Sequence, residues 1–318
     1  MDSLTGVAPK RVLLFGATGT AGQGALRALL AAGHAVSCVL RRPVDLPEGA
    51  QKIYADVTAP MEISEQFDVV VTCLASRTGA PKDAWRIDHD AQLNVLALAQ
   101  AVGARQFVLL SAICVQKPVL AFQQAKLAFE GRLRDSGMEY SIVRPTAFFK
   151  SLSGQLDRVR AGKPFLVFGD GRLTACKPIS DDDLGRYIAG CLEDPARVNR
   201  VLPIGGPGPA ITPLDQAAAL ERLLGRPVAI RHVPVALLTV ICGGLGLVGR
   251  VFPRVRAKAD LARIGRYYAT ESMLVLNPET GRYDAQATPS SGSDTLFQFY
   301  EDLIAAQGSI ERGDHSVF

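Results

Sequence analysis

The stretch Arg11-Val-Leu-Leu-Phe-Gly-Ala-Thr-Gly-Thr-Ala-Gly22 decides the fold of this chain. Residues 11–15 are mostly apolar and predict a buried strand, whereas residues 23–32 have the composition of a helix. A glycine turn between a strand and a helix brings backbone N–H groups and the helix N-terminus to one point, which is how a pyrophosphate is bound. The spacing is G-x-x-G-x-x-G rather than G-x-G-x-x-G, and an ordinary glycine-rich turn is the alternative. We therefore expect a dinucleotide site formed by Gly16, Thr18, Gly19 and Gly22.

The end of the second expected strand indicates which dinucleotide is bound. Residues 35–40 are an apolar run that stops at Arg41 and Arg42. In a Rossmann unit an acid at this point bonds the ribose 2′-hydroxyl, whereas an arginine accommodates a 2′-phosphate. The two arginines favour NADPH over NADH, with a solvated basic strand end as the alternative. Asp56 follows a third expected strand over residues 52–55 and by position approaches the adenine amino group.

The composition describes a globular and rather apolar chain. Its 318 residues are 48% hydrophobic and 21% charged, which is enough for one large domain or for a domain with a smaller lobe. A net charge of +4 is too small to indicate a nucleic-acid partner. The six cysteines are scattered without a C-x-x-C pair, and the four histidines form no ligand-like pair. These patterns predict a reducing compartment and no metal site.

The N-terminal residues carry the expectation for cellular location. They have neither the apolar core of a signal peptide nor the long Ser/Arg-rich leader of a plastid precursor. We therefore expect a cytoplasmic bacterial protein, with a mature organellar form as the alternative.

Apolar strands and helical patterns alternate along the chain. Strands are expected over residues 68–73, 106–111 and 140–143, and helices over residues 88–102 and 121–135. This alternation predicts an α/β fold with a doubly wound, mostly parallel Rossmann sheet. We expect residues 1–150 to form the NADP-binding domain, with later segments completing the sheet, and residues 151–318 to form largely a smaller, substrate-binding lobe. Among those segments are a helix over 180–193, a strand over 200–204 and a capped helix from Thr212 to Gly225.

The expected catalytic positions resemble those of the short-chain dehydrogenase/reductase superfamily in its extended and atypical branches. That superfamily places a serine after the fifth strand and a Y-x-x-x-K pair on the next helix. Ser111 and Lys126 match two of these positions, but Phe122 stands where the tyrosine would be. Phenylalanine has no proton to give to a carbonyl oxygen, so ordinary ketone chemistry is disfavoured. The resemblance implies that Ser111 contacts the cofactor and that Lys126 binds the ribose or relays a proton; an exposed helix lysine is the alternative.

Two later motifs are more specific. Residues 144–155, Arg-Pro-Thr-Ala-Phe-Phe-Lys-Ser-Leu-Ser-Gly-Gln, resemble a stretch typical of the divinyl chlorophyllide 8-vinyl reductases, and so do residues 277–281, 285–290 and 294–296. The resemblance covers nearly the whole chain. It implies NADPH-dependent reduction of the 8-vinyl group of a divinyl chlorophyllide or protochlorophyllide to ethyl, in chlorophyll or bacteriochlorophyll synthesis. Loss of the catalytic tyrosine agrees with this activity, because a C=C bond has no oxygen to protonate.

Other functions and several roles stay open at this point. The rival functions are a non-catalytic NADP-binding sensor or assembly factor and an ene reductase of another aromatic metabolite. The proton donor is Lys126, Tyr267, Tyr268 or water. For a tetrapyrrole substrate we expect Phe148 and Phe149 to line an apolar wall, with a core role as the alternative. Lys150, or a member of the cluster over residues 254–258, would meet the propionate.

Residues 233–249 form a segment without a charged side chain, followed at once by a basic cluster. A bilayer span needs about twenty residues, so this glycine-broken segment is too short for a transmembrane helix. A buried segment is the first expectation, and a hydrophobic lip or a peripheral contact with a membrane surface is the alternative. The cluster that follows suits an anionic headgroup, a substrate carboxylate or simply water, and it contains Arg250, Arg254, Arg256 and Lys258.

Overall fold

A seven-stranded parallel sheet forms the centre of the protein. The computed structural model describes residues 8–248 and 252–306. The strand order is β3-β2-β1-β4-β5-β6-β8, and every neighbouring pair is parallel, which confirms the doubly wound Rossmann sheet. The strands are β1 (Arg11–Phe15), β2 (Ala35–Leu40), β3 (Gln51–Tyr54), β4 (Val69–Thr72), β5 (Gln106–Leu110), β6 (Glu139–Pro145) and β8 (Arg200–Ile204).

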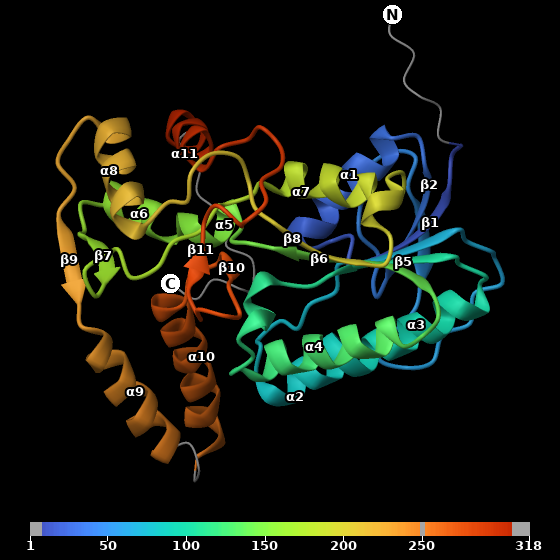
Figure 1. Ribbon diagram of the computed structural model, residues 1–318, viewed down its shortest axis with the longest axis horizontal. Coiled ribbons are helices and arrows are strands. Elements are labelled where there is room, and N and C mark those ends of the chain that lie inside the picture. The colour runs from blue at the N-terminus through green and yellow to red at the C-terminus, as the bar shows by residue number, and fades with distance from the viewer. Residues whose placement is uncertain (1–7, 249–251, 307–318) are drawn as a thin grey trace, which may run out of the picture.

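Helices cover both faces of this sheet (Figure 1). On one face lie α1 (Thr20–Ala31) and α7 (Asp181–Gly190), and on the other lie α3 (Gln92–Ala101) and α4 (Ala121–Arg134). Two separate apolar cores fill the space between the sheet and the helices. The axes of α1 and α7 come very close, because Gly24 and Gly185 face each other and a Cβ atom on either would overlap the backbone of the opposite helix.

The helix expected over residues 88–102 differs from the observed one. The chain forms a short α2 (Pro81–Ala84), continues as a π-helix over Trp85–Ala91, and only then becomes α3. The wider π turn holds Asp88 at its centre, and this carboxylate is buried. A hydrophobic pattern does not distinguish the two kinds of turn, and π turns often occur at functional sites.

The smaller lobe packs around a core of its own. Its elements are α5 (Phe149–Leu152), a 3-10 turn (Ser153–Gln155), α6 (Leu156–Arg160), β7 (Phe165–Phe168), α8 (Pro213–Leu224), β9 (Ile230–Val233) and α11 (Leu296–Ala305). Helix α8 begins and ends as expected: Thr212 and Asp215 form a capping box, and Gly225 ends the helix at a φ of +62°. Shorter elements complete the chain: β10 (Val275–Leu276), β11 (Tyr283–Asp284) and 3-10 turns at Ile113–Gln116 and Pro195–Arg197.

Two helices extend from this lobe as a hairpin, α9 (Val235–Val248) and α10 (Pro253–Thr270) (Figure 1). The expectation that the uncharged segment is buried was wrong. Most of its described side chains face solvent, Val240 is 70% exposed, and Cys242 is the buried member. The segment lies at the edge of the molecule with α10 as its main neighbour, so much of the helix surface is exposed within the described part of the chain. Among the described residues, no helix is long and apolar enough to cross a bilayer.

Candidate active site

The glycine turn after β1 is shaped to receive a phosphate. Gly16 has a φ of +77°, and a Cβ atom there would lie 2.8 Å from the backbone carbon of Cys73, which directly follows the neighbouring strand β4. A Cβ atom on Gly22 would overlap the Gly16 carbonyl. The Gly19 N–H donates to that carbonyl at 3.1 Å, and α1 then begins with no acidic residue in its first turn. The N–H groups of the first turn therefore point at the site where an anion would lie.

Beside this turn, the place where the adenosine of a dinucleotide would lie is open. Thr18 and Arg27 contribute to a hollow of about 240 Å³ that the loop after β2 closes on its other side. Arg41 and Arg42 are exposed at the end of β2. Asp56 accepts hydrogen bonds from the N–H and the hydroxyl of Thr58 at 2.9 and 2.8 Å, and these bonds, with the nearby Arg41, lower its pKa. The exposed arginines of this region fit the 2′-phosphate of NADP. Contacts between these residues and the cofactor stay predictions.

Lys126 is buried in an ion pair. Its Nζ atom lies 3.0 Å from Asp88 Oδ1, and the Lys126 side chain is 10% exposed and that of Asp88 0%. The same Oδ1 accepts the Ser76 N–H at 3.2 Å, while Asp88 Oδ2 has no hydrogen-bond partner among the described residues. An exposed helix lysine is therefore excluded. The pair leaves a buried acceptor beside the cation, which suits a ligand that carries hydroxyl groups.

Ser111 is engaged in a second buried network. Its hydroxyl donates to Glu130 Oε1 at 2.5 Å, and Arg144 forms an ion pair with the same carboxylate, with Nε at 3.1 Å from Oε1. Glu130 lies one helical turn after Lys126 on α4, so the two side chains share a face. In this structure the Ser111 hydroxyl is held by Glu130, and its contact with a cofactor stays a prediction.

Helix α10 covers this end of the sheet and brings two tyrosines to it. The Tyr267 hydroxyl donates to the Cys114 carbonyl at 3.0 Å. The Tyr268 hydroxyl lies against the Cys114 thiol, and burial raises the pKa of Tyr268 well above its usual value. The positive charge of Lys126 also lowers the pKa of the same thiol, although burial raises that pKa overall.

Apolar side chains surround these polar groups. Phe122 packs with Ile264 of α10, and both come within reach of the Gly79 backbone. Phe122 thus lies at the described site in the position that a catalytic tyrosine would take. The buried Nε2 atom of Gln123, the next residue, has no partner among the described residues. An apolar enclosure with a few inward polar groups is the usual form of a small-molecule site.

The expected substrate residues lie in different surroundings. Phe149 is only 4% exposed and packs in the lobe core, with its ring centre 5.5 Å from that of Phe299, so the alternative of a core aromatic holds. Phe148 is half-buried and packs against the core between the sheet and α7. Lys150 is partly exposed and its Nζ lies 3.6 Å from Asp181 at the start of α7. Burial raises the pKa of Asp181 and the charge of Lys150 opposes that effect.

The sequence pattern did not identify Asp88, Glu130, Cys114 and Gln123. For Glu130 a signal was present, since it follows Lys126 by four residues on one helix. Asp88 lies 38 residues before its partner in an irregular turn, and no spacing rule joins them. Arg250 lies outside the described residues, as does the side chain of Arg254.

Comparison with known proteins first defines the class. Residues 16–195 match the NAD(P)H-binding family, so the chain is a Rossmann-type protein that binds NAD(P)H. The fold is also that of the NADPH-dependent quinone oxidoreductase of Escherichia coli complexed with NADPH. That structure aligns with a TM-score of 0.65 and 16% identity, over 92% of this chain and 99% of the other.

Sequence similarity then defines the particular family. The divinyl chlorophyllide a 8-vinyl-reductase of Oryza sativa subsp. indica, a chloroplastic protein, is 47% identical over 96% of this chain and 82% of its own length. This chain belongs to the family of divinyl chlorophyllide a 8-vinyl-reductases. A more distant relative, the photosystem II assembly factor Ycf39 of Synechocystis, is 26% identical over 72% of each chain.

Proposed function

We propose that this chain uses NADPH to reduce the 8-vinyl group of a divinyl chlorophyllide or protochlorophyllide to ethyl. The observation that carries the proposal is the buried Lys126–Asp88 pair in an apolar enclosure with phenylalanine at position 122. A site for carbonyl reduction needs a proton donor aimed at an oxygen. This site instead combines a cation and an apolar wall, which suits a C=C bond attached to a flat macrocycle.

The residues that would hold the cofactor follow from the geometry. The glycine turn with Gly16, Gly19 and Gly22 would bind the pyrophosphate, and Thr18 would line the adenosine side. The adenosine end would lie near Arg41, Arg42 and Asp56. At the other end Lys126 and Asp88 would bind the hydroxyl groups of the nicotinamide ribose, and Ser111 would contact the nicotinamide. When bound, NADPH supplies the hydride that one carbon of the vinyl group receives.

The second vinyl carbon needs a proton, and we assign its donor to Tyr268. Its hydroxyl lies against the Cys114 thiol, on which the charge of Lys126 also acts, whereas the Tyr267 hydroxyl is used by a backbone carbonyl. Burial raises the pKa of Tyr268, so the phenol keeps its proton until a strong base forms beside it. Lys126 would then stabilise the phenolate and pass on a proton from water. One hydride and one proton together convert vinyl to ethyl.

The proposed substrate contacts are apolar except at one edge. Phe122 and Ile264 would form the wall. Lys150, which lies beside Asp181, would meet the propionate. A cation at the edge sets orientation rather than affinity, because burial of the macrocycle supplies most of the binding. We expect the methyl ester to bind nearly as well as the free acid and to be reduced more slowly. Equal turnover of the ester and the acid would show that no cation contacts that edge.

The rival proposal is a non-catalytic NADP-binding assembly factor, in line with the Ycf39 relative. The cluster around Lys126 favours the reductase, since binding alone does not need a buried cation at the nicotinamide end. We also keep the expected location, the cytoplasm of a bacterium, as part of the proposal. Both chlorophyllide and protochlorophyllide stay candidate substrates.

Absorption spectroscopy tests the proposal directly. Purified protein is incubated with NADPH and divinyl chlorophyllide, and the Soret band is followed. Loss of a conjugated double bond should move the band to shorter wavelength, with one NADPH oxidised per macrocycle. A Lys126→Met variant should bind NADPH and turn over more slowly. An unchanged band with tight NADPH binding would favour the assembly factor.

A further inference from the structure

The α9–α10 hairpin has an unusual combination of charge and apolar surface. Residues 235–270 contain six basic side chains and one acidic side chain, a net charge of +5 in a chain whose total is +4. The rest of the protein is therefore close to neutral. The single acid, Asp260, is mostly buried and forms an ion pair with Arg263 at 2.8 Å, so it adds little negative surface. The hairpin is the basic part of the molecule.

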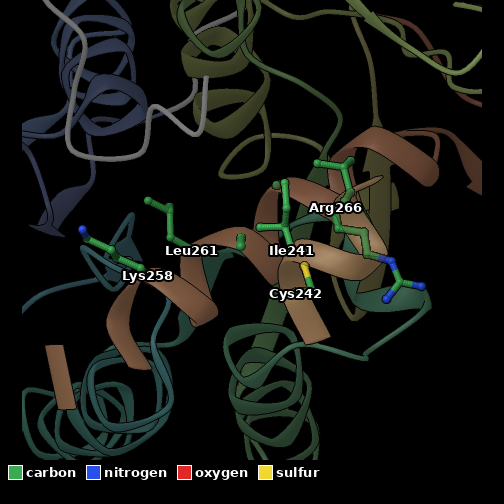
Figure 2. A pocket seen from close by; sticks show the side chains of 8 residues that line it. Ile241, Cys242, Lys258, Leu261 and Arg266 are labelled. Atoms are coloured by element: carbon green, nitrogen blue, oxygen red, sulfur yellow. The ribbon is translucent and has the colours of Figure 1, made fainter. Parts of the chain in front are cut away.

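The same hairpin exposes large apolar side chains. Leu237, Val240 and Val248 of α9 and Leu261 of α10 are each about half exposed or more, as is Phe252 just before α10. Figure 2 shows that Ile241 and Leu261 lie along a groove between the two helices, with Lys258 at one end of it and Arg266 at the other. The groove has a volume of about 220 Å³. That is below the roughly 300–1,000 Å³ of ligand pockets, so it is too small to hold the substrate.

We propose that this hairpin seats the protein on an anionic lipid surface. Its exposed apolar side chains would enter the boundary between headgroups and acyl chains, and Arg256, Lys258 and Arg266 would meet lipid phosphates. Helix α9 is 14 residues long, or about 21 Å, and a bilayer core is about 30 Å thick. The helix would therefore lie in the interface and not cross it.

Charge decides between a lipid surface and a second copy of this chain. A dimer through this face would place Arg256, Lys258 and Arg266 of two copies against each other. An anionic bilayer offers the opposite charge together with an apolar layer beneath it, which matches both properties of the hairpin. The inference goes beyond the proposed reduction, because binding to lipid needs neither NADPH nor turnover.

The orientation that follows connects the lipid surface to the site. Helix α10 carries Lys258 and Leu261 on its outer side and Ile264 and Tyr267 toward the site. An apolar macrocycle that partitions into the membrane would therefore meet the protein at one side of α10 and reach the site at the other.

Vesicle co-sedimentation tests the inference with the full chain. We compare vesicles of phosphatidylcholine with vesicles that contain phosphatidylglycerol, at low and at high salt. The wild-type chain should bind the anionic vesicles at low salt and lose binding as salt increases. Two double variants, Leu237→Glu/Val240→Glu and Arg256→Glu/Lys258→Glu, should each bind at least about tenfold more weakly. The first removes apolar side chains that enter the interface, and the second removes two basic residues that each contribute about fivefold.

The matched controls are Val119→Glu, at a side chain that is 60% exposed outside the hairpin, and Lys163→Glu, at an exposed lysine of the lobe. Both should bind vesicles as the wild type does, and unchanged NADPH affinity shows that every variant is folded. The inference is overturned by a wild-type chain that stays in the supernatant, or by hairpin variants that bind like the controls. It is also overturned if light scattering shows a dimer that only the hairpin variants dissociate.

Discussion

The Lys126–Asp88 ion pair permits a quantitative prediction. With 3.0 Å between the charged atoms and an effective dielectric constant of about 20, their attraction is about 5.5 kcal/mol. Asp88→Asn keeps the acceptor for the Ser76 N–H and removes only the charge. Because the Lys126 cation then stays buried without a partner, we expect a loss of about 3–5 kcal/mol in the free energy of unfolding. Without its carboxylate partner the Lys126 ammonium should also move from its position in the site, and we expect this displacement to lower turnover at least about tenfold.

Urea unfolding and turnover measurements check this prediction. The double variant Asp88→Asn/Lys126→Met removes both charges and should be more stable than Asp88→Asn by about 2 kcal/mol or more. The exposed pair of Arg11 and Asp68 is the control, and Asp68→Asn should cost about 1 kcal/mol or less. If Asp88→Asn costs no more than the control, or if the double variant is as unstable as the sum of the single variants, the reasoning is refuted.

Three further predictions concern the cofactor and the proton. Arg41→Ala should weaken NADPH binding by about ten- to a hundredfold and leave NADH binding nearly unchanged in titrations, and equal losses would exclude a 2′-phosphate contact. Tyr268→Phe should lower turnover with NADPH affinity intact, whereas Tyr267→Phe should have a smaller effect; the reverse order would assign the proton to Tyr267. Gly22→Ala should abolish NADPH binding by calorimetry, because the added methyl group overlaps the Gly16 carbonyl, and a variant that binds normally would contradict the close packing.

The sheet could be predicted from the sequence because its determinants are local. The strands at Arg11–Phe15, Ala35–Leu40 and Arg200–Ile204 occur within the predicted bounds, since an apolar run between turn residues defines each of them. The capped helix from Thr212 to Gly225 was predictable for the same reason.

The errors concern features that depend on the surroundings of a segment. An uncharged run predicts burial only if other elements cover it, and α9 is covered mainly by α10. The sequence was equally compatible with Phe149 in a substrate pocket and with Phe149 in the apolar core. In the structure Phe149 packs in the core of the lobe, where its ring contacts Phe299, a residue 150 positions later in the chain. The pairing of Asp88 with Lys126 likewise depends on how a π turn meets α4.

The close contact between α1 and α7 bears on how the chain folds during synthesis. Helix α1 is made within the first 31 residues, but the surface that covers its Leu26 and Leu29 includes Leu184 and Ile188 of α7. The last strand of the sheet, β8, follows only at residues 200–204. The NADP-binding domain therefore stays incomplete on the ribosome until part of the smaller lobe has emerged. A fragment that ends at residue 150 would expose the apolar side of α1 and should aggregate when expressed alone.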